Sequence, residues 1–254
     1  MDMEFRAPRT AIVTGGARRI GAAIARALSA DGWHLLIHCN HSRVDADTLA
    51  GEVGNAKVVQ AELANADAAA TIFDALHDLP PARLLVNNAS RFVYDGADSF
   101  SAADWDAHQA VNLRAPALLT QAFAAQARKG GGLVVNLLDA KLAQPNPDFF
   151  SYTISKMGLA GLTELAARAY ASRSVRVCGI APAVTLVSGP QSRENFDAVH
   201  RLNALERGVQ VGEIVAALRF LVATPTITGQ IITLDAGQRF LGLPRDVQFL
   251  EPVT

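Results

Sequence analysis

The sequence predicts an α/β protein: a single doubly wound Rossmann-type domain with a seven-stranded parallel sheet and helices on both faces. Short apolar runs of strand length alternate along the chain with longer segments of helical period. A glycine-rich segment follows the first apolar run at once, and no Pro/Ser/Gly-rich linker divides the 254 residues. This alternation is typical of right-handed βαβ units, whose strands are parallel.

The first half of the chain supplies four strands and three helices. Its strands are almost wholly apolar, as expected where helices cover both faces of a sheet. The expected strands are 10–14, 33–39, 56–63 and 83–90, and the expected helices are 19–32, 44–53 and 67–79.

The second half continues the alternation with a long helix and three more strands. The expected helices are 105–127, 151–171 and 211–222, and the expected strands are 132–138, 175–181 and 230–235. The one long interruption is 184–208, which contains Gly189-Pro190 and many polar residues. It follows a strand end on the side where ligands bind in such sheets, so we expect a substrate lid. The alternative is a solvated connection that contains a short helix.

Composition excludes several classes of function. Half of the residues are hydrophobic and the net charge is -1, which gives no electrostatic basis for binding nucleic acid or an anionic membrane. Two distant cysteines make no disulfide framework, and the six histidines show no metal-binding spacing, so no metal is expected. With no export signal or long apolar run, we expect a cytoplasmic protein whose partner is a small phosphorylated molecule.

The segment TGGARRIG, residues 14–21, predicts a phosphate-binding turn. It lies between the first strand and the first helix, where backbone N–H groups at a helix N-terminus can hold a pyrophosphate. Gly15, Gly16 and Gly21 let the ligand and the neighbouring strand approach closely. A bare glycine pattern is a weak signal, and its place on the first strand-to-helix turn is what strengthens it.

The end of the second strand predicts NADPH rather than NADH. Folds that select NAD place an acidic residue there for the ribose 2'-hydroxyl, and HCNHSR, residues 38–43, contains none. Asn40, His41, Ser42 and Arg43 offer hydrogen-bond donors instead, and Arg18 can add a charge-assisted bond to a 2'-phosphate. For His38 and His41, a simple polar role at the strand end remains an equal alternative.

Tyr152 and Lys156 form the expected catalytic pair. In SYTISK they are four residues apart, so a helix sets both on one face. A lysine ammonium beside a phenol is expected to lower the tyrosine pKa and to make the phenol an effective proton donor.

Four motifs in order carry a family resemblance. TGGARRIG, VNNAS at 86–90, VNL at 111–113 and Tyr152/Lys156 make the sequence resemble the short-chain dehydrogenase/reductase family over essentially its whole length. The resemblance implies that 87–89 supports the sheet and borders the cofactor, and that Asn112 anchors a water relay to Lys156. It also implies that Lys156 holds the nicotinamide ribose while Tyr152 donates the proton.

The sequence departs from the family pattern at two positions. Arg19 replaces a glycine, and Asp139, thirteen residues before Tyr152, replaces a serine. An anionic Asp139 would oppose a forming alkoxide, whereas an Asp–Tyr pair suits proton delivery to nitrogen during reduction of a C=N bond. The alternative for Asp139 is a strand-end cap that points to solvent.

These departures resemble the pteridine reductases and dihydromonapterin reductases. NNASRF and NLLDAKLAQPNPDFFSYTISK are similar to that subgroup in content and spacing. By this resemblance Phe92 would stack on a pterin, and Ser90 would touch the pterin or the cofactor phosphates; the alternative for Phe92 is a core position. The implied cofactor-binding set is Gly15, Arg18, Arg19, Ile20, Asn40, His41, Ser42, Glu62, Asn88, Ala89, Ser90, Tyr152, Lys156 and Pro182.

The leading expectation is an NADPH-dependent reductase that delivers hydride to C6 and a proton to N5 of a 7,8-dihydropterin. Tyr152, Lys156, Asp139 and Asn112 would form the catalytic set. The alternatives are a carbonyl reductase for a 3-oxoacyl, sugar or other ketone, and a non-catalytic NADPH-binding protein. The resemblance also implies a homotetramer. The tail at 243–254 has no assigned role and could pack on a neighbouring subunit.

Overall fold

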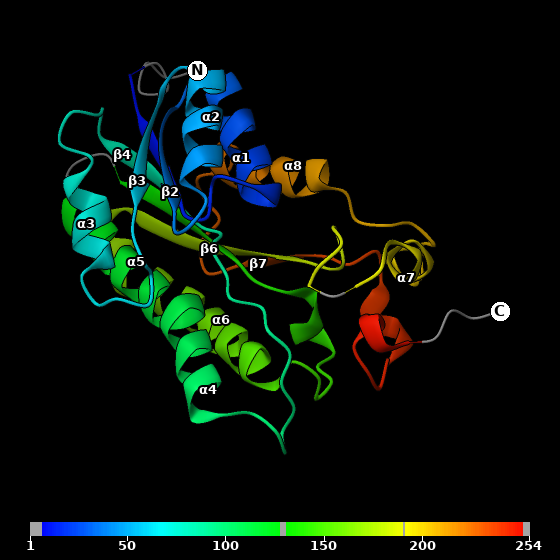
Figure 1. Cartoon of the computed structure of the whole chain (residues 1–254). Helices are drawn as coiled ribbons and strands as arrows, with labels where there is room; N and C mark the ends of the chain where they lie inside the picture. Colours follow the sequence, from blue (N-terminus) through cyan, green and yellow to red (C-terminus); the bar gives the residue numbers. More distant parts are fainter. Residues whose placement is uncertain (1–6, 128–130, 190, 251–254) are drawn as a thin grey trace.

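Seven parallel strands form one sheet in a computed structural model that describes residues 7–127, 131–189 and 191–250 (Figure 1). The strand order is β3-β2-β1-β4-β5-β6-β7, which confirms the predicted fold class. The order reverses beside β1, so the carboxyl ends of β1 and β4 border the crevice in which such sheets bind ligands. The strands are β1 Thr10–Val13, β2 His34–Cys39, β3 Ala56–Gln60, β4 Ala82–Asn87, β5 Gly132–Leu137, β6 Val175–Pro182 and β7 Ile231–Leu234.

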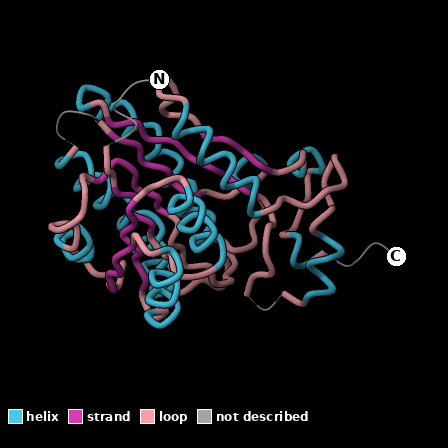
Figure 2. Tube along the Cα trace, turned by 90° about the horizontal axis from the view of Figure 1, so that it is seen from above, coloured by secondary structure: helices cyan, strands magenta, loops and turns pink. Residues whose placement is uncertain are grey.

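Helices cover both faces of the sheet (Figure 2). One face carries α1 Arg19–Ala30, α2 Arg43–Val53 and α8 Val211–Ala223, and the other carries α3 Ala68–Asp74, α4 Ala102–Gln109, α5 Ala115–Gln126 and α6 Phe150–Tyr170. Helix α7, Arg193–Val199, lies apart from both layers. In the described residues, no helix is both long and apolar enough to span a membrane.

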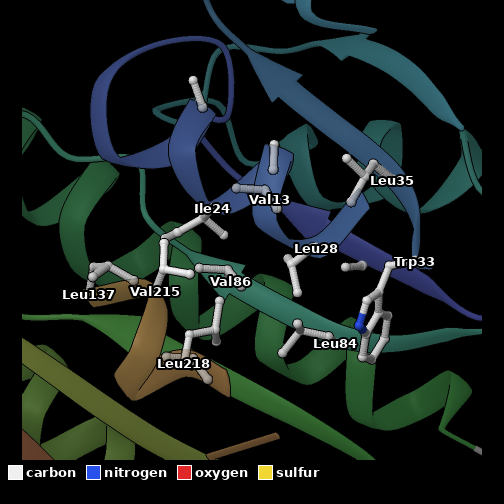
Figure 3. Packing of buried hydrophobic residues seen from close by; sticks show 14 of the residues in the cluster. Val13, Ile24, Leu28, Trp33, Leu35, Leu84, Val86, Leu137, Val215 and Leu218 are labelled. Carbon is white, nitrogen blue, oxygen red and sulfur yellow. The ribbon is translucent and has the colours of Figure 1, made fainter. Parts of the chain in front are cut away.

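Alternate residues of each central strand pack into opposite layers. Val13 and Val86 contact Ile24 of α1 and Val215 of α8 on one face (Figure 3), while Ile12 lies in the cluster on the other face. All of these side chains are buried, and each contributes about 1.5–3 kcal/mol by leaving water. The packed sheet therefore holds the strand ends, from which the functional residues extend, in fixed positions.

The helix predicted over 105–127 begins earlier and changes pitch in its middle. A π-helical turn, Ala110–Arg114, separates α4 from α5 and contains the buried Asn112. Pro116 has no N–H, so the α-helical hydrogen bond to the Asn112 carbonyl cannot form there. Such π turns are frequent at functional sites, and periodicity alone did not reveal this one.

Candidate active site

The turn after β1 has the tight backbone geometry that the glycines of 14–21 predicted. Gly15 has a φ of +59°, and a side chain at Gly21 would place its Cβ 2.2 Å from the carbonyl oxygen of Gly15. Helix α1 has neither a side-chain N-cap nor an acidic residue in its first turn, so its N-terminus presents free N–H groups to the adjoining cavity. The turn is thus open to an anion and too tight for larger residues.

Asn88 fastens this turn to β4. Its side-chain amide donates to the carbonyls of Thr14 and Gly15 over 2.8 and 3.0 Å. The Thr14 hydroxyl accepts in return from the backbone N–H groups of Asn88 and Ala89, each at 3.0 Å. Asn87 supports the sheet itself, because its amide donates to Asn136 on β5 over 2.8 Å.

His38 is a structural link beneath the phosphate turn. Its Nδ1 accepts the N–H of Gly15 at 3.2 Å, and its Nε2 lies 3.0 Å from the carbonyl of Ala61. The first contact requires an unprotonated Nδ1, so the imidazole is neutral and donates from Nε2; burial lowers its pKa accordingly. His38 therefore carries no charge toward a phosphate. The signal available in the sequence was a polar residue inside an otherwise apolar strand.

The two arginines of the turn both line the cavity and contact side chains of two other segments. Arg18 is exposed and its Nε donates to Asp45 over 2.8 Å, so a carboxylate just beyond residues 38–43 already pairs with it. Arg19 has a φ of +53°, a backbone conformation that explains why glycine is usual at this position. Its guanidinium donates to Ser188 over 3.4 Å, which links the turn to the segment predicted as a lid.

A polar pair borders the cavity just after β2 and β3. Asn40 donates from its side-chain amide to Glu62, and the second oxygen of Glu62 accepts the N–H of Ala64 at 3.0 Å. Both residues line the cavity together with His41 and Ser42. The hydroxyl of Ser42 does not cap α2, which leaves it available to a ligand.

Asp139 and Tyr152 meet at the base of the cavity. The Tyr152 hydroxyl donates to Oδ2 of Asp139 over 2.8 Å. The other oxygen, Oδ1, accepts the N–H of Lys141 at 2.8 Å and so caps a short 3-10 helix, Ala140–Ala143. The carboxylate therefore caps a turn, as one interpretation expected, and also accepts a hydrogen bond from Tyr152; its catalytic role stays a prediction.

The predicted pKa of Tyr152 is wrong in direction. The pKa lies well above its ordinary value, first because the phenol is buried and then because Asp139 opposes a second negative charge. Lys156 Nζ lies 5.7 Å from the centroid of the Tyr152 ring and donates to the carbonyl of Leu137 over 2.7 Å. Burial lowers the pKa of Lys156 to about 8. Tyr152 is thus a neutral hydrogen-bond donor rather than a phenolate.

Asn112 supports the site from behind the cavity. Its amide donates to the Arg91 carbonyl over 2.9 Å and to the Ser155 hydroxyl over 3.0 Å, while its Oδ1 accepts from the Arg91 N–H at 2.8 Å. The exposed Ser90 donates to the same Oδ1 at 3.2 Å. Asn112 therefore joins the loop after β4 to the helix that carries Tyr152.

A second buried network, which the sequence analysis missed, holds the start of α6. Ser151 donates its hydroxyl to Asp95, and its N–H donates to the other Asp95 oxygen at 3.0 Å. His108 Nδ1 lies 2.7 Å from the Ser151 oxygen, and Nε2 accepts the N–H of Val93 at 3.3 Å. All three side chains are buried. No spacing rule relates residues 95, 108 and 151, so only the fold reveals them.

Phe92 forms part of an aromatic wall rather than of the core. It is half-buried, stacks on Phe149 at 4.2 Å between ring centroids and meets Tyr152 edge-on at 4.7 Å. Phe149 has a φ of +52° just before α6, an unusual conformation for a non-glycine residue.

One cavity of about 890 Å³ brings the predicted residues together. Asn112 does not reach it. The predicted residues that line it are Gly15, Arg18, Arg19, Ile20, Asn40, His41, Ser42, Glu62, Asn88, Ala89, Ser90, Phe92, Asp139, Tyr152, Lys156 and Pro182.

Comparisons with known proteins agree with the geometry. Residues 9–197 match the family model described as short chain dehydrogenase. The crystal structure of FolM alternative dihydrofolate reductase 1 from Brucella canis, complexed with NADP, superimposes with a TM-score of 0.90 at 38% identity, covering 94% of this chain and 97% of that one.

Two curated relatives show the range of activities among similar sequences. Pteridine reductase 1 of Leishmania tarentolae is 30% identical over 275 residues, covering 89% of this chain and 95% of that protein. A 3-oxoacyl-[acyl-carrier-protein] reductase of Synechocystis is 30% identical over 238 residues, covering 90% and 96%. The expected resemblance to pteridine reductases is confirmed. The chain belongs to the short-chain dehydrogenase/reductase family of oxidoreductases.

Proposed function

We propose that the protein is an NADPH-dependent dihydropterin reductase. A 7,8-dihydropterin would gain a hydride at C6 and a proton at N5, giving the tetrahydropterin and NADP⁺. The observation that carries this proposal is the 2.8 Å hydrogen bond from Tyr152 to the carboxylate of Asp139, at a position where the family usually has serine. An acid pair suits protonation of a nitrogen, whereas an ionised Asp139 would oppose a forming alkoxide.

The residues around the cavity fit NADPH. The cradle at Gly15 and Gly21, beside the uncapped N-terminus of α1, suits a pyrophosphate. Arg18 and Ser42 line the cavity and would contact a 2'-phosphate, and Lys156, which also lines it, would hold the nicotinamide ribose. When bound, NADPH supplies the hydride.

Tyr152 and Asp139 would deliver the proton. Because the pKa of Tyr152 is raised, its hydroxyl keeps its proton at neutral pH. That proton points at Asp139, so donation to the substrate requires Asp139 to take up a proton from solvent and leave the tyrosine free to turn. Proton uptake by Asp139, donation by Tyr152 and return of the proton from Asp139 to Tyr152 complete one cycle.

The substrate end supports a flat heterocycle. Phe92 lines the cavity beside Tyr152, and the buried Phe149 supports its ring from behind, so one aromatic ring is available to a pterin. The segment 184–208 is proposed to close over the bound pterin. Residue 190 of this segment lies outside the described residues. The segment includes both the short helix α7 and residues that line the cavity, among them Thr185 and Ser188.

The names of similar proteins support this proposal and one alternative. Relatives named as a dihydrofolate reductase and a pteridine reductase favour a pterin. The relative named as a 3-oxoacyl reductase favours a ketone. Asp139 favours the pterin over the ketone. Reduction of a ketone would develop negative charge on oxygen beside the Asp139 carboxylate, and the two charges would repel each other.

One spectrophotometric screen tests substrate and cofactor together. Dihydropterin, dihydrofolate and a set of ketones are each incubated with NADPH or NADH, and loss of the reduced-cofactor absorbance band is followed. We expect rapid loss with dihydropterin and NADPH. Turnover of ketones alone would instead establish the carbonyl reductase, and no turnover of any substrate would favour a non-catalytic NADPH-binding protein.

A homotetramer is also proposed. The alanine-rich helices at 104–127 and 153–171 would supply close-packed interfaces between subunits, and Leu165 on α6 is 67% exposed in the single chain. Light scattering on the purified protein measures the mass directly. A mass close to 26.9 kDa would identify a monomer and contradict the proposal.

A further inference from the structure

The C-terminal segment, residues 243–250, returns to the mouth of the active site. It lies beside α7, at the red end of the chain in Figure 1. Leu243, Arg245, Asp246, Val247 and Gln248 line the same cavity as Tyr152. Residues 251–254 of the tail lie outside the described residues. The tail that the sequence left unassigned therefore forms part of the substrate end within its own chain.

An ion pair clamps this segment in place. Arg245 forms a bidentate pair with Asp148, with Nε at 2.7 Å from one carboxylate oxygen and Nη2 at 2.9 Å from the other. The N–H of Asp246 donates to Asp148 as well, over 2.8 Å. The Asp148 side chain is 6% exposed, so the clamp is anchored in a buried group. Paired, directional bonds of this kind fix orientation as well as position.

Aromatic contacts add a second attachment. The Phe249 ring lies 5.9 Å from the Phe149 ring and 5.0 Å from the Tyr94 ring, measured between centroids. Phe149 in turn stacks on Phe92. The C-terminal segment is thus packed against the aromatic side chains that support Phe92, and these contacts help to fix its position.

The clamp brings the Asp246 carboxyl group into the cavity. Its Oδ2 lies 3.5 Å from the Lys141 ammonium, and its Oδ1 accepts the Gln248 N–H at 3.1 Å. Its side chain is 16% exposed. A carboxylate has about four acceptor positions, so these two contacts leave others open. The negative charge of Asp246 also helps to raise the pKa of Tyr152, which agrees with a position of Asp246 near the Tyr152 hydroxyl.

We propose that Asp246 is a specificity-determining residue whose carboxyl oxygens accept hydrogen bonds from N–H or O–H groups of the substrate. The inference rests on the proposed function. A dihydropterin offers such donors from two sources, the amino-pyrimidinone edge of the ring and hydroxyl groups on a side chain at C6. Arg245 and Asp148 act as positioning residues that hold Asp246 in reach.

Two Asp246 variants and two substrates test the assignment. Asp246→Asn keeps the size and one acceptor oxygen, whereas Asp246→Ala removes both. With NADPH we expect KM for the dihydropterin to rise about 10-fold in Asp246→Asn and more in Asp246→Ala, while KM for NADPH stays within about twofold. A rise with unsubstituted dihydropterin assigns the contact to the ring. A rise only with a hydroxylated C6 chain assigns it to the chain.

Two further variants test the positioning role of Arg245 and provide a control. Arg245→Met is expected to raise the same KM, because it releases the clamp without touching the carboxylate of Asp246. Asp78→Asn, which removes an equally negative but exposed group that pairs with Lys57 away from the cavity, is expected to leave both KM values unchanged. Unchanged KM for both dihydropterins in both Asp246 variants overturns the assignment.

Calorimetric titration of the NADP⁺ complex with the same pterins separates this inference from the proposed function. If the unaltered protein binds pterins without reducing them, the proposed function fails and weaker binding by Asp246→Asn still supports the assignment. Equal binding by the variant overturns the assignment in that case. If no pterin binds at all, both proposals are wrong.

Discussion

The Tyr152 hydroxyl donates to one oxygen of Asp139 over 2.8 Å, while the other oxygen of the same carboxylate accepts a backbone N–H. One carboxylate oxygen of Asp139 is therefore held by a backbone hydrogen bond. The other accepts the hydrogen bond from the Tyr152 hydroxyl, whose proton can exchange. Such a group can pass a proton without losing its place, because the backbone bond remains throughout.

Asp139→Ala is expected to abolish dihydropterin reduction while cofactor binding survives. Loss of a general acid partner lowers kcat by about 10²–10⁴-fold. NADPH affinity, measured by cofactor fluorescence, is expected to stay unchanged. Asp139→Ser, which restores the usual family residue, is expected to lose the pterin activity and to favour ketones. Full pterin activity in Asp139→Ala would show that the Asp–Tyr proposal is wrong.

Asp45 is expected to set the strength of NADPH binding through Arg18. Its carboxylate pairs with Arg18 at 2.8 Å and would compete with a 2'-phosphate. Asp45→Asn is expected to lower KM for NADPH about threefold, and Arg18→Gln to raise it about 10-fold, with KM for NADH unaffected in both.

Arg26→Gln serves as the matched control for the cofactor test. Arg26 lies on α1, the helix that follows Arg18, and it pairs with Glu52 away from the cavity. Its replacement is therefore expected to leave KM for NADPH and KM for NADH unchanged. Equal shifts for NADPH and NADH in Arg18→Gln would mean that Arg18 does not contact a 2'-phosphate.

Folding stability is expected to depend on pH through His38. Burial lowers the pKa of His38 below its ordinary value of about 6.5, so the unfolded chain binds more protons than the folded chain in that range. Its stabilising contribution is fully present above about pH 6.5 and is lost as pH falls toward the folded-state pKa. Protonation would also remove the acceptor for Gly15 N–H.

Urea unfolding between about pH 5 and about pH 7.5 tests the prediction for His38, because it measures the free energy of unfolding at each pH. His38→Gln, which does not titrate, is expected to cost about 1–2 kcal/mol at neutral pH and to reduce the acid-side slope. The difference between the two curves isolates His38 from the other histidines. Parallel curves would contradict the assignment of a neutral, buried imidazole.

Ser151→Ala is expected to reduce kcat without changing KM for NADPH. The Ser151 hydroxyl bridges His108 and the buried Asp95, and its loss leaves a buried carboxylate with one donor fewer, at a cost of about 1–3 kcal/mol. The start of α6, and Tyr152 with it, loses part of its attachment. Ser29→Ala, which breaks a hydroxyl contact between α1 and α2, is expected to spare kcat. An equal loss of kcat in both variants would indicate a general effect of stability.

Local patterns in the sequence were sufficient for the fold and for much of the site. Alternating strand and helix periods predicted the parallel sheet, and the glycines of 14–21 predicted the phosphate turn, because each depends on residues close together in the chain. Tyr152 and Lys156 share a helix face for the same reason. Asp139 stood out because it is one of two positions, with Arg19, at which the sequence departs from the family pattern.

The tertiary structure decided what depends on distant partners and on burial. Arg245 and Asp148 are 97 residues apart, and Ser151 and Asp95 are 56 apart, so no periodicity connects them. The raised pKa of Tyr152 also required the fold, since the loss of water around the phenol has no local sequence signal. The sequence by itself determined which groups the protein carries and on which elements. Packing of the chain decided which of them meet and in which protonation state, because both contact across the sheet and desolvation are properties of the whole fold.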